Sequence, residues 1–136
     1  MQSIQRRIDK KYELVTAPFA YDETQFNELG TADAAVNFYK PKVGKQFVIT
    51  GIIAAGNLSI AANALATVVV YEGSSTTDTS ADKTLIQFGI TRLQTEPLLS
   101  LNILVNEGKF INAKTDDDDV FLTIMGYYIP ALGGAQ

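Results

Sequence analysis

The sequence predicts an all-β fold, a jelly-roll-like antiparallel β-sandwich that follows an irregular N-terminal arm. Short runs of β-branched and aromatic residues recur roughly every 10–20 residues from position 35 onward. The connections between them are rich in Gly, Pro, Asn, Asp and Ser and leave little room for helices, a pattern typical of sandwiches and barrels. With 136 residues, 46% of them hydrophobic, the chain fits one domain with a core of its own.

Residues 1–34 are predicted to form the arm and residues 35–136 the sandwich domain. Ile4, Ile8 and Tyr12 recur at helical spacing, but three residues are too few to stabilise an isolated helix in water. The stretch that follows mixes proline and glycine with Asp, Asn and Thr, which predicts an extended segment or loop. Its aromatic residues are expected to insert into pockets of the domain: Phe19, Tyr21 and Phe26.

Seven apolar segments bounded by turn residues are predicted as strands. They cover residues 35–40, 46–55, 66–72, 84–90, 98–105, 109–113 and 119–129. The connection at 56–65 has room for one short helical turn, and the chain shows no internal repeat.

Some of these strands are apolar on both faces. In 119–129 one alternating set contains Val120 and Leu122, and the other contains Phe121 and Met125. The outer faces of an isolated sandwich are polar, so such strands need a second cover. That cover is either another copy of the chain or the N-terminal arm folded back over one sheet.

A subunit interface is therefore predicted on side chains that point away from the core. Tyr71, Tyr127 and Tyr128 could line a carbohydrate surface, but packing in a subunit interface is favoured because tyrosine is enriched there. The predicted interface residues are Val69, Tyr71, Phe121, Met125 and Tyr127.

The net charge and the length of the apolar runs argue against two partners, nucleic acid and a membrane. The net charge of −4 argues against nucleic-acid binding, and no apolar run approaches the roughly 20 residues needed to span a bilayer. Residues 1–11 carry four basic residues and one Asp, a net of +3, which leaves −7 for the rest. A basic segment before an acidic body is typical of a tail with a partner of its own.

The composition leaves few routes to catalysis. The sequence has no histidine and no cysteine, which excludes Ser-His-Asp and thiolate nucleophiles and most zinc sites. The acidic candidates Glu72, Glu96 and Glu107 fall in predicted turns or strand ends, without a facing pair. We therefore predict that the protein is not an enzyme and has no cofactor and no metal.

Four consecutive aspartates, Asp116–Asp119, precede the last predicted strand. An EF-hand loop that began at Asp116 would need Gly at its sixth position and Glu at its twelfth, but Phe121 and Tyr127 stand there. Adjacent carboxylates on an extended backbone also diverge. A solvated turn that charges the entry to an apolar strand is favoured, and a cation site completed by carbonyls of another loop is the alternative.

Residues 45–129 resemble small jelly-roll virion proteins of tailed bacteriophages, of the capsid cement (decoration) or head-fibre type. The resemblance lies in the runs FVITGI, VVYE and LNILVNEGKFI and in the closing GYY. It implies a homotrimeric structural protein on the capsid surface of the virion, with the major capsid protein as partner and a shell-stabilising role. The alternative that it implies is a head-fibre or tail-associated receptor-binding module that recognises host glycan.

The same resemblance implies that the arm reaches along the shell. The basic residues would meet an acidic shell surface, and the apolar ones would anchor the arm. These capsid-binding residues would be Ile4, Arg6, Arg7, Ile8, Lys10, Lys11 and Tyr12.

Overall fold

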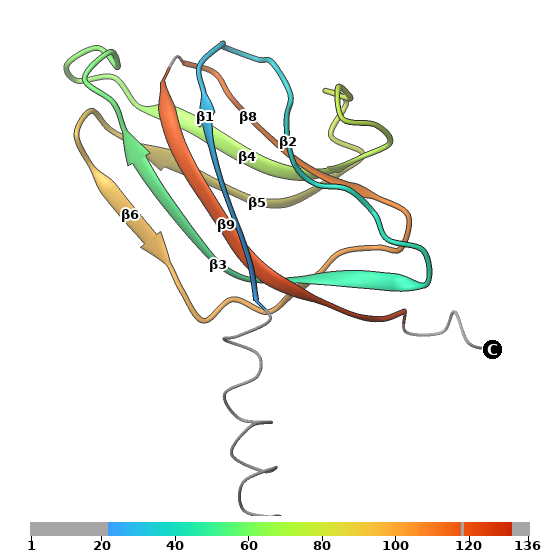
Figure 1. Cartoon of the computed structure of the whole chain (residues 1–136). Coiled ribbons are helices and arrows are strands. Elements are labelled where there is room, and N and C mark those ends of the chain that lie inside the picture. Colours follow the sequence, from blue (N-terminus) through green and yellow to red (C-terminus); the bar gives the residue numbers. More distant parts are fainter. Residues whose placement is uncertain (1–21, 118, 132–136) are drawn as a thin grey trace, which may run out of the picture.

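The computed structural model describes residues 22–117 and 119–131, which form two antiparallel sheets packed as a sandwich (Figure 1). The strands are β1 (Glu23–Leu29), β2 (Val36–Tyr39), β3 (Lys45–Gly56), β4 (Ala66–Gly73), β5 (Lys83–Ile90), β6 (Thr95–Leu98), β7 (Ile103–Leu104), β8 (Phe110–Thr115) and β9 (Val120–Pro130). The larger sheet, sheet A, has the order β1-β9-β3-β6, and β7 pairs with β3 beside β6. The smaller, sheet B, has the order β2-β8-β4-β5.

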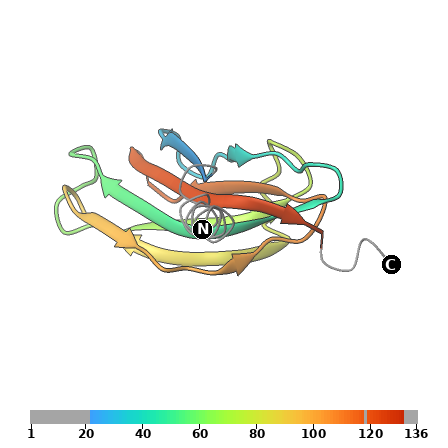
Figure 2. The same cartoon turned by 60° about the horizontal axis from the view of Figure 1, so that its bottom comes forward.

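These orders are those of a jelly roll when β6 and β7 are counted as one interrupted strand. The predicted all-β sandwich is confirmed. Figure 2 shows β1 and β2 along one side of the sandwich and β5 and β6 along the opposite side. The two sides therefore differ in which strand edges they expose.

The predicted strand at 98–105 is divided into β6 and β7. Between them Ser100 adopts a positive φ of 58°, a left-handed conformation that ends regular strand geometry. The backbone N–H of Leu101 donates to the carbonyl oxygen of Thr50 at 2.9 Å, which holds the intervening loop against β3. In the connection at 56–65, hydrogen bonds from Ile60 to Asn57 and from Ala64 to Ala61 close two turns.

Part of the predicted irregular arm is a strand. β1 pairs antiparallel with β9, from Glu23 opposite Gly126 to Leu29 opposite Val120. Leu29 is fully buried in the core, whereas the predicted pocket residue Phe26 is 58% exposed. The prediction for Phe26 is wrong because β1 is an edge strand whose alternation turns this ring outward. Phe19 and Tyr21 lie outside the described residues.

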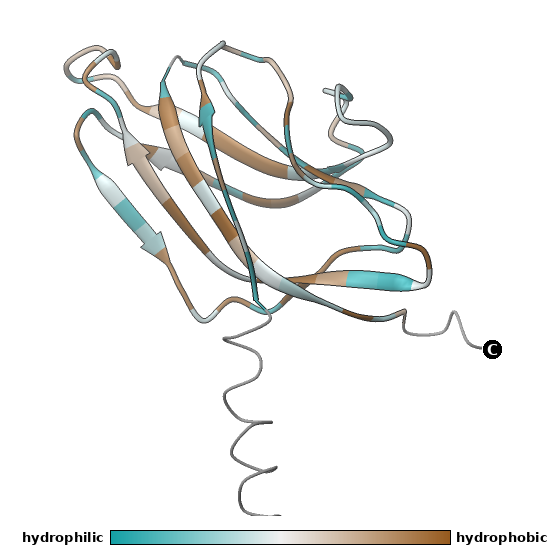
Figure 3. Cartoon of the chain, in the orientation of Figure 1, coloured by the Kyte–Doolittle hydropathy of each residue, from teal (hydrophilic) through white to brown (hydrophobic). Residues whose placement is uncertain are grey.

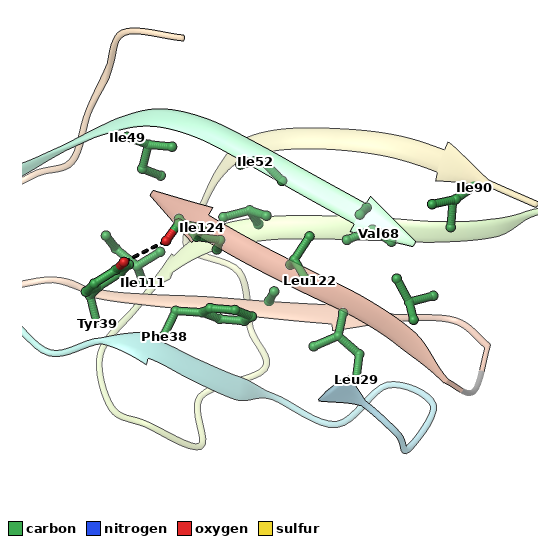
Figure 4. Close-up of a cluster of buried hydrophobic side chains, with 14 of the residues drawn as sticks. Leu29, Phe38, Tyr39, Ile49, Ile52, Val68, Ile90, Ile111, Leu122 and Ile124 are labelled. Carbon is green, nitrogen blue, oxygen red and sulfur yellow. Dashed lines mark hydrogen bonds between the residues drawn. The ribbon is translucent and has the colours of Figure 1, made fainter. Parts of the chain in front are cut away.

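The core lies between the sheets and takes every second side chain of the central strands. Val68 and Val70 of β4 and Leu122 and Ile124 of β9 are fully buried, as the alternation in the sequence predicts. Tyr39 of β2 donates its hydroxyl hydrogen bond to the carbonyl oxygen of Ile124 at 2.6 Å, across the cluster drawn in Figure 4. This hydrogen bond satisfies the buried hydroxyl and also links the two sheets.

Candidate functional site

The outer face of sheet A is apolar along its centre. On β9, Phe121, Met125 and Tyr127 alternate with the core residues and are half-buried. On the flanking strands Phe26 is 58% and Ile53 is 37% exposed. Figure 3 shows hydrophobic residues along β3 and β9, the central strands of this sheet. This outer face of sheet A, defined by these five residues, is the candidate site.

An aromatic stack forms one end of the face. The rings of Phe26 and Phe121 lie with centroids 6.1 Å apart and planes at 17°, because Phe121 stands opposite Glu28, two residues from Phe26 along β1. Offset stacking of this kind adds about 1 kcal/mol to the burial of the rings. The pair presents a hydrophobic surface where an edge strand is usually polar.

A depression of about 400 Å³ forms the other end of the face. It opens where β3 shifts register against β9 between Ile49 and Gly51. A side chain at position 51 would lie 2.8 Å from the Cε of Met125, so glycine leaves the hollow open. The lining is largely apolar and comes from Asp22, Thr50, Gly51, Leu99, Ser100, Leu101, Met125 and Tyr127.

Val48 shows that this face buries apolar surface apart from the main core. It is only 5% exposed, yet it does not belong to the cluster between the sheets. It stands opposite Leu104 of β7 and Tyr127 of β9. Sheet A therefore has hydrophobic packing on both of its sides.

Sheet B is different, because the chain's own loop between β4 and β5 covers part of its outer face. The Tyr71 hydroxyl donates to the carbonyl oxygen of Asp78 at 2.6 Å. The Asn112 amide donates to that of Ser75 at 2.9 Å, and the Lys114 ammonium to that of Thr79 at 2.7 Å. This loop (residues 74–80) gives the part of sheet B around Tyr71 a polar, hydrogen-bonded exterior.

Asp78 holds the loop in shape. Its two carboxylate oxygens accept hydrogen bonds from the backbone N–H and hydroxyl groups of Ser74 and Ser80, at 2.6–3.0 Å. These bonds, with that from the Ser80 hydroxyl the strongest, favour the ionised form and hold the pKa of Asp78 well below its ordinary value.

The predicted interface residues thus fall into two groups. Phe121, Met125 and Tyr127 lie together on the outer face of sheet A. Tyr71 is fully buried beneath its own loop, and Val69 lies half-buried on sheet B opposite Lys114. Of the three tyrosines also offered as carbohydrate ligands, Tyr71 is covered and Tyr127 lies on the outer face of sheet A. The Tyr128 ring meets Phe47 edge-on, with centroids 4.9 Å apart.

Two residues of the face, Phe26 and Ile53, were not predicted from the sequence as interface residues, and neither was Leu99 of the adjoining depression. Leu99 is 59% exposed at the rim of the depression. The signal for Ile53 was present, because strand 46–55 is apolar on both faces. Phe26 and Leu99 carry no such signal, since each lies in a segment whose pairing depends on another strand.

The described aspartates of the run, Asp116, Asp117 and Asp119, lie at the entry to β9. The Asp116 carboxylate accepts a hydrogen bond from the backbone N–H of Thr67 at 2.7 Å, and Asp119 adopts a φ of 57°. A hydrogen bond to Asp119 raises the pKa of Glu28 above its ordinary value. Among the residues that the structure describes, no three acidic side chains gather closely enough to hold a metal ion. Asp118 lies outside them.

All seven predicted arm residues, from Ile4 to Tyr12, lie outside the described part of the chain. Within that part, no helix has the length and hydrophobicity to cross a bilayer.

Comparison with known proteins yields likenesses to solved structures only. No family model matches the sequence, and no curated protein matches it either. A solved structure from work described as "Bacillus endospore appendages form a novel family of disulfide-linked pili" aligns with 82% of this chain and 88% of its own, at 10% sequence identity and a TM-score of 0.48. It is a pilus component, whereas this sequence contains no cysteine from which a disulfide link could form.

This finding corrects the resemblance to bacteriophage virion proteins. The prediction of a capsid decoration protein was wrong, as were its homotrimer, its major capsid protein partner, its capsid-surface location and its receptor-binding alternative, since the match is to an endospore appendage. The physical reason is that FVITGI, VVYE and GYY are general strand patterns, rich in β-branched and aromatic residues. Any jelly roll produces such patterns, and fold does not imply function.

Proposed function

We propose that the protein is a non-enzymatic structural subunit that self-associates, with the outer face of sheet A as a contact between copies. The observation that carries this proposal is the contrast between the two sheets. Sheet B is partly covered by its own loop through Tyr71, Asn112 and Lys114. Sheet A presents Phe26, Phe121 and Ile53 toward solvent.

The chemistry of the face favours a second copy as its partner. Its centre is apolar and free of charge, and Asp22 and Glu28 lie at its margins. A contact between two identical faces related by a twofold axis pairs apolar centre with apolar centre. Each half-exposed large side chain that becomes buried contributes about 1 kcal/mol, so the contact is favourable once several rings are covered.

The chain's own N-terminal segment is the competing cover. It joins the described residues at Asp22, on the rim of the depression. Removal of residues 1–20 distinguishes the two arrangements, since an intramolecular cover would hide the face until it is deleted. We expect self-association of the full chain without truncation.

The test is the mass of the protein in solution. A face variant, Phe26→Lys with Ile53→Lys, places two charges on exposed positions of the contact. We expect a concentration-dependent increase in mass for the native chain and a marked loss of it for the face variant. Gln25→Lys, an equally charged change at an exposed position on the same strand, serves as the control and should associate normally. A native chain that remains monomeric, truncated or not, would contradict the proposal.

The endospore appendage offers an example of open assembly, since its published description is of pili. Such a polymer of the present chain would be held by non-covalent contacts, because the sequence supplies no thiol. A single face-to-face contact gives only a closed dimer.

A further inference from the structure

The four outer strand edges of the sandwich are not equally protected. β1 carries Glu23 and Glu28, β2 has four residues and a register shift, and β6 is short and contains Pro97. Charges, irregularities, prolines and short length are the features by which proteins prevent edge-to-edge pairing. Each of these three edges therefore has a feature that opposes pairing.

β5 has little such protection. It runs for eight residues, Lys83–Ile90, without proline, and its single charge lies at the first position. Its register shift against β4 lies near its start, between the partners Ile86 and Thr84, which leaves Ile86–Ile90 regular. Among the described residues its backbone pairs only with β4. Every second residue of β5 consequently directs its backbone N–H and C=O outward, where they are available to hydrogen-bond with another strand.

The core is also incompletely covered along this side. Leu85, Ile86 and Phe88 of β5 pack against the core but are only partly buried. Across the sandwich, Leu98, Leu101 and Ile103 of the β6–β7 region are partly buried in the same way. Figures 1 and 2 place β5 and β6 on the same side of the molecule. An unpaired edge and an under-covered strip of core therefore coincide.

We propose that β5 pairs antiparallel with β5 of a second copy, so that two B sheets form one continuous sheet of eight strands. The backbone of an edge strand specifies another strand as its partner. Self-pairing about the middle of β5, near Gln87, places the two Lys83 side chains at opposite ends of the ladder, which avoids like-charge repulsion. It also places Ile86 opposite Phe88 of the second copy, and Phe88 opposite Ile86 of the second copy. These side chains then cover the part of the core that is only partly buried in one copy.

This second contact deepens the proposed self-association, and its consequence for assembly rests on that proposal. A β5 pair has its own twofold axis, distinct from the axis of a contact between two A sheets. Two different twofold contacts on one subunit cannot both be satisfied within a single dimer. Together they therefore generate an open chain of subunits. The face and the edge together make the protein a building block of a linear polymer.

Charge at the centre of the edge tests the proposal. Gln87 is exposed, and its side chain is opposite Val69 on the outer side of sheet B. Gln87→Lys places like charges together in the β5 pair, whereas Gln25→Lys makes the same change on the β1 edge. We expect native protein and Gln25→Lys to form polymers, and Gln87→Lys to stop at twice the chain mass of 14.8 kDa. Sedimentation and negative-stain electron microscopy measure both.

The outcomes separate the two contacts. The face variant should also stop at the dimer, now held by β5, and its combination with Gln87→Lys should be monomeric. A polymer unaffected by Gln87→Lys overturns the edge contact and leaves the face, whereas one unaffected by the face variant overturns the face. If the native chain forms only dimers, the variant that makes them monomeric identifies the single contact, and the proposal fails unless that variant is Gln87→Lys.

Cross-linking supplies a readout that does not depend on assembly size. Because the chain has no cysteine, Gln87→Cys introduces a single thiol, and Gln25→Cys gives the matched control. Residues opposite one another or diagonal in a paired ladder have Cα atoms about 5–8 Å apart, within reach of a short bis-maleimide. We expect a covalent dimer from Gln87→Cys in the face-variant background and none from Gln25→Cys; equal yields would contradict the β5 pair.

Discussion

The hydroxyl of Tyr39 donates a 2.6 Å hydrogen bond to the carbonyl oxygen of Ile124, and this bond joins β2 of sheet B to β9 of sheet A. The ring stacks on Phe47 with centroids 4.2 Å apart. Burial is the main cause that raises the pKa of Tyr39 above its ordinary value near 10. The neutral phenol is therefore the form that the folded protein requires.

Replacement of this hydroxyl should weaken the link between the sheets. Tyr39→Phe keeps the ring but leaves the Ile124 carbonyl without this donor, and we expect a loss of about 1–2 kcal/mol in the free energy of unfolding. Because the folded pKa is raised, native stability should also fall as the pH rises above 10. Denaturant unfolding across that pH range measures both effects. If the free energy of unfolding of Tyr39→Phe falls with alkaline pH as steeply as that of the native chain, the fall is caused by other groups.

The loop over sheet B should respond to acid through Asp78. Its pKa is lowered in the folded protein, so its contribution to stability is present above the ordinary value of 3.8 and is lost as the pH falls below it. Asp78→Asn cannot accept all four hydrogen bonds. We expect faster amide hydrogen exchange in residues 74–80 and a lower Tm at neutral pH, with the difference from the native chain shrinking toward pH 2. A difference that stays constant with pH would argue against the carboxylate.

Gly126 should tolerate no side chain. It lies in β9 opposite Ile49, where a Cβ atom would overlap the carbonyl oxygen of Val48 and the ring of Phe47. Gly126→Ala should cost about 3 kcal/mol or prevent folding, because backbone and ring cannot both move aside. Gly30→Ala, whose Cβ would approach only side chains at 3.6 Å and beyond, should change stability by less than about 0.5 kcal/mol. Thermal unfolding of the two variants provides the comparison.

The carboxyl pair of Glu28 and Asp119, at the entry to β9, should destabilise the folded state at neutral pH. The hydrogen bond to Asp119 raises the pKa of Glu28, so the folded state binds this proton more tightly than the unfolded state. The favourable contribution is present below the ordinary value of 4.5 and is lost as the pH rises through the folded value. Glu28→Gln keeps a donor for Asp119 without the charge, and it should slightly raise the Tm at pH 7. An equal gain at pH 3 would point to a cause other than ionisation.

Period-two alternation was sufficient to predict much of this structure. It placed Val120 and Leu122 in the core and Phe121 and Met125 on the other side of β9, as observed. It also placed Tyr71 on an outer face, but it could not reveal the cover over that face. That cover depends on the loop at 74–80, whose shape comes from four hydrogen bonds to one carboxylate.

Long-range pairing explains the remaining differences. β1 exists because β9 offers it an edge, and no local pattern around Phe26 encodes that partner. The break at Ser100 likewise follows from contact of the loop with β3. The phage resemblance was wrong for a related reason, since strand alternation reports packing and carries no record of what the outer faces meet.

The loop at 74–80 makes the two outer faces of the sandwich different from each other. Thr77, which is exposed, and its half-buried neighbour Thr76 lie over sheet B, on the side opposite the apolar face. A foreign peptide grafted between these two threonines, before Asp78, would project from the side that the sheet A contact leaves unused. The scaffold could then carry epitopes or binding tags at regular intervals along whatever it builds.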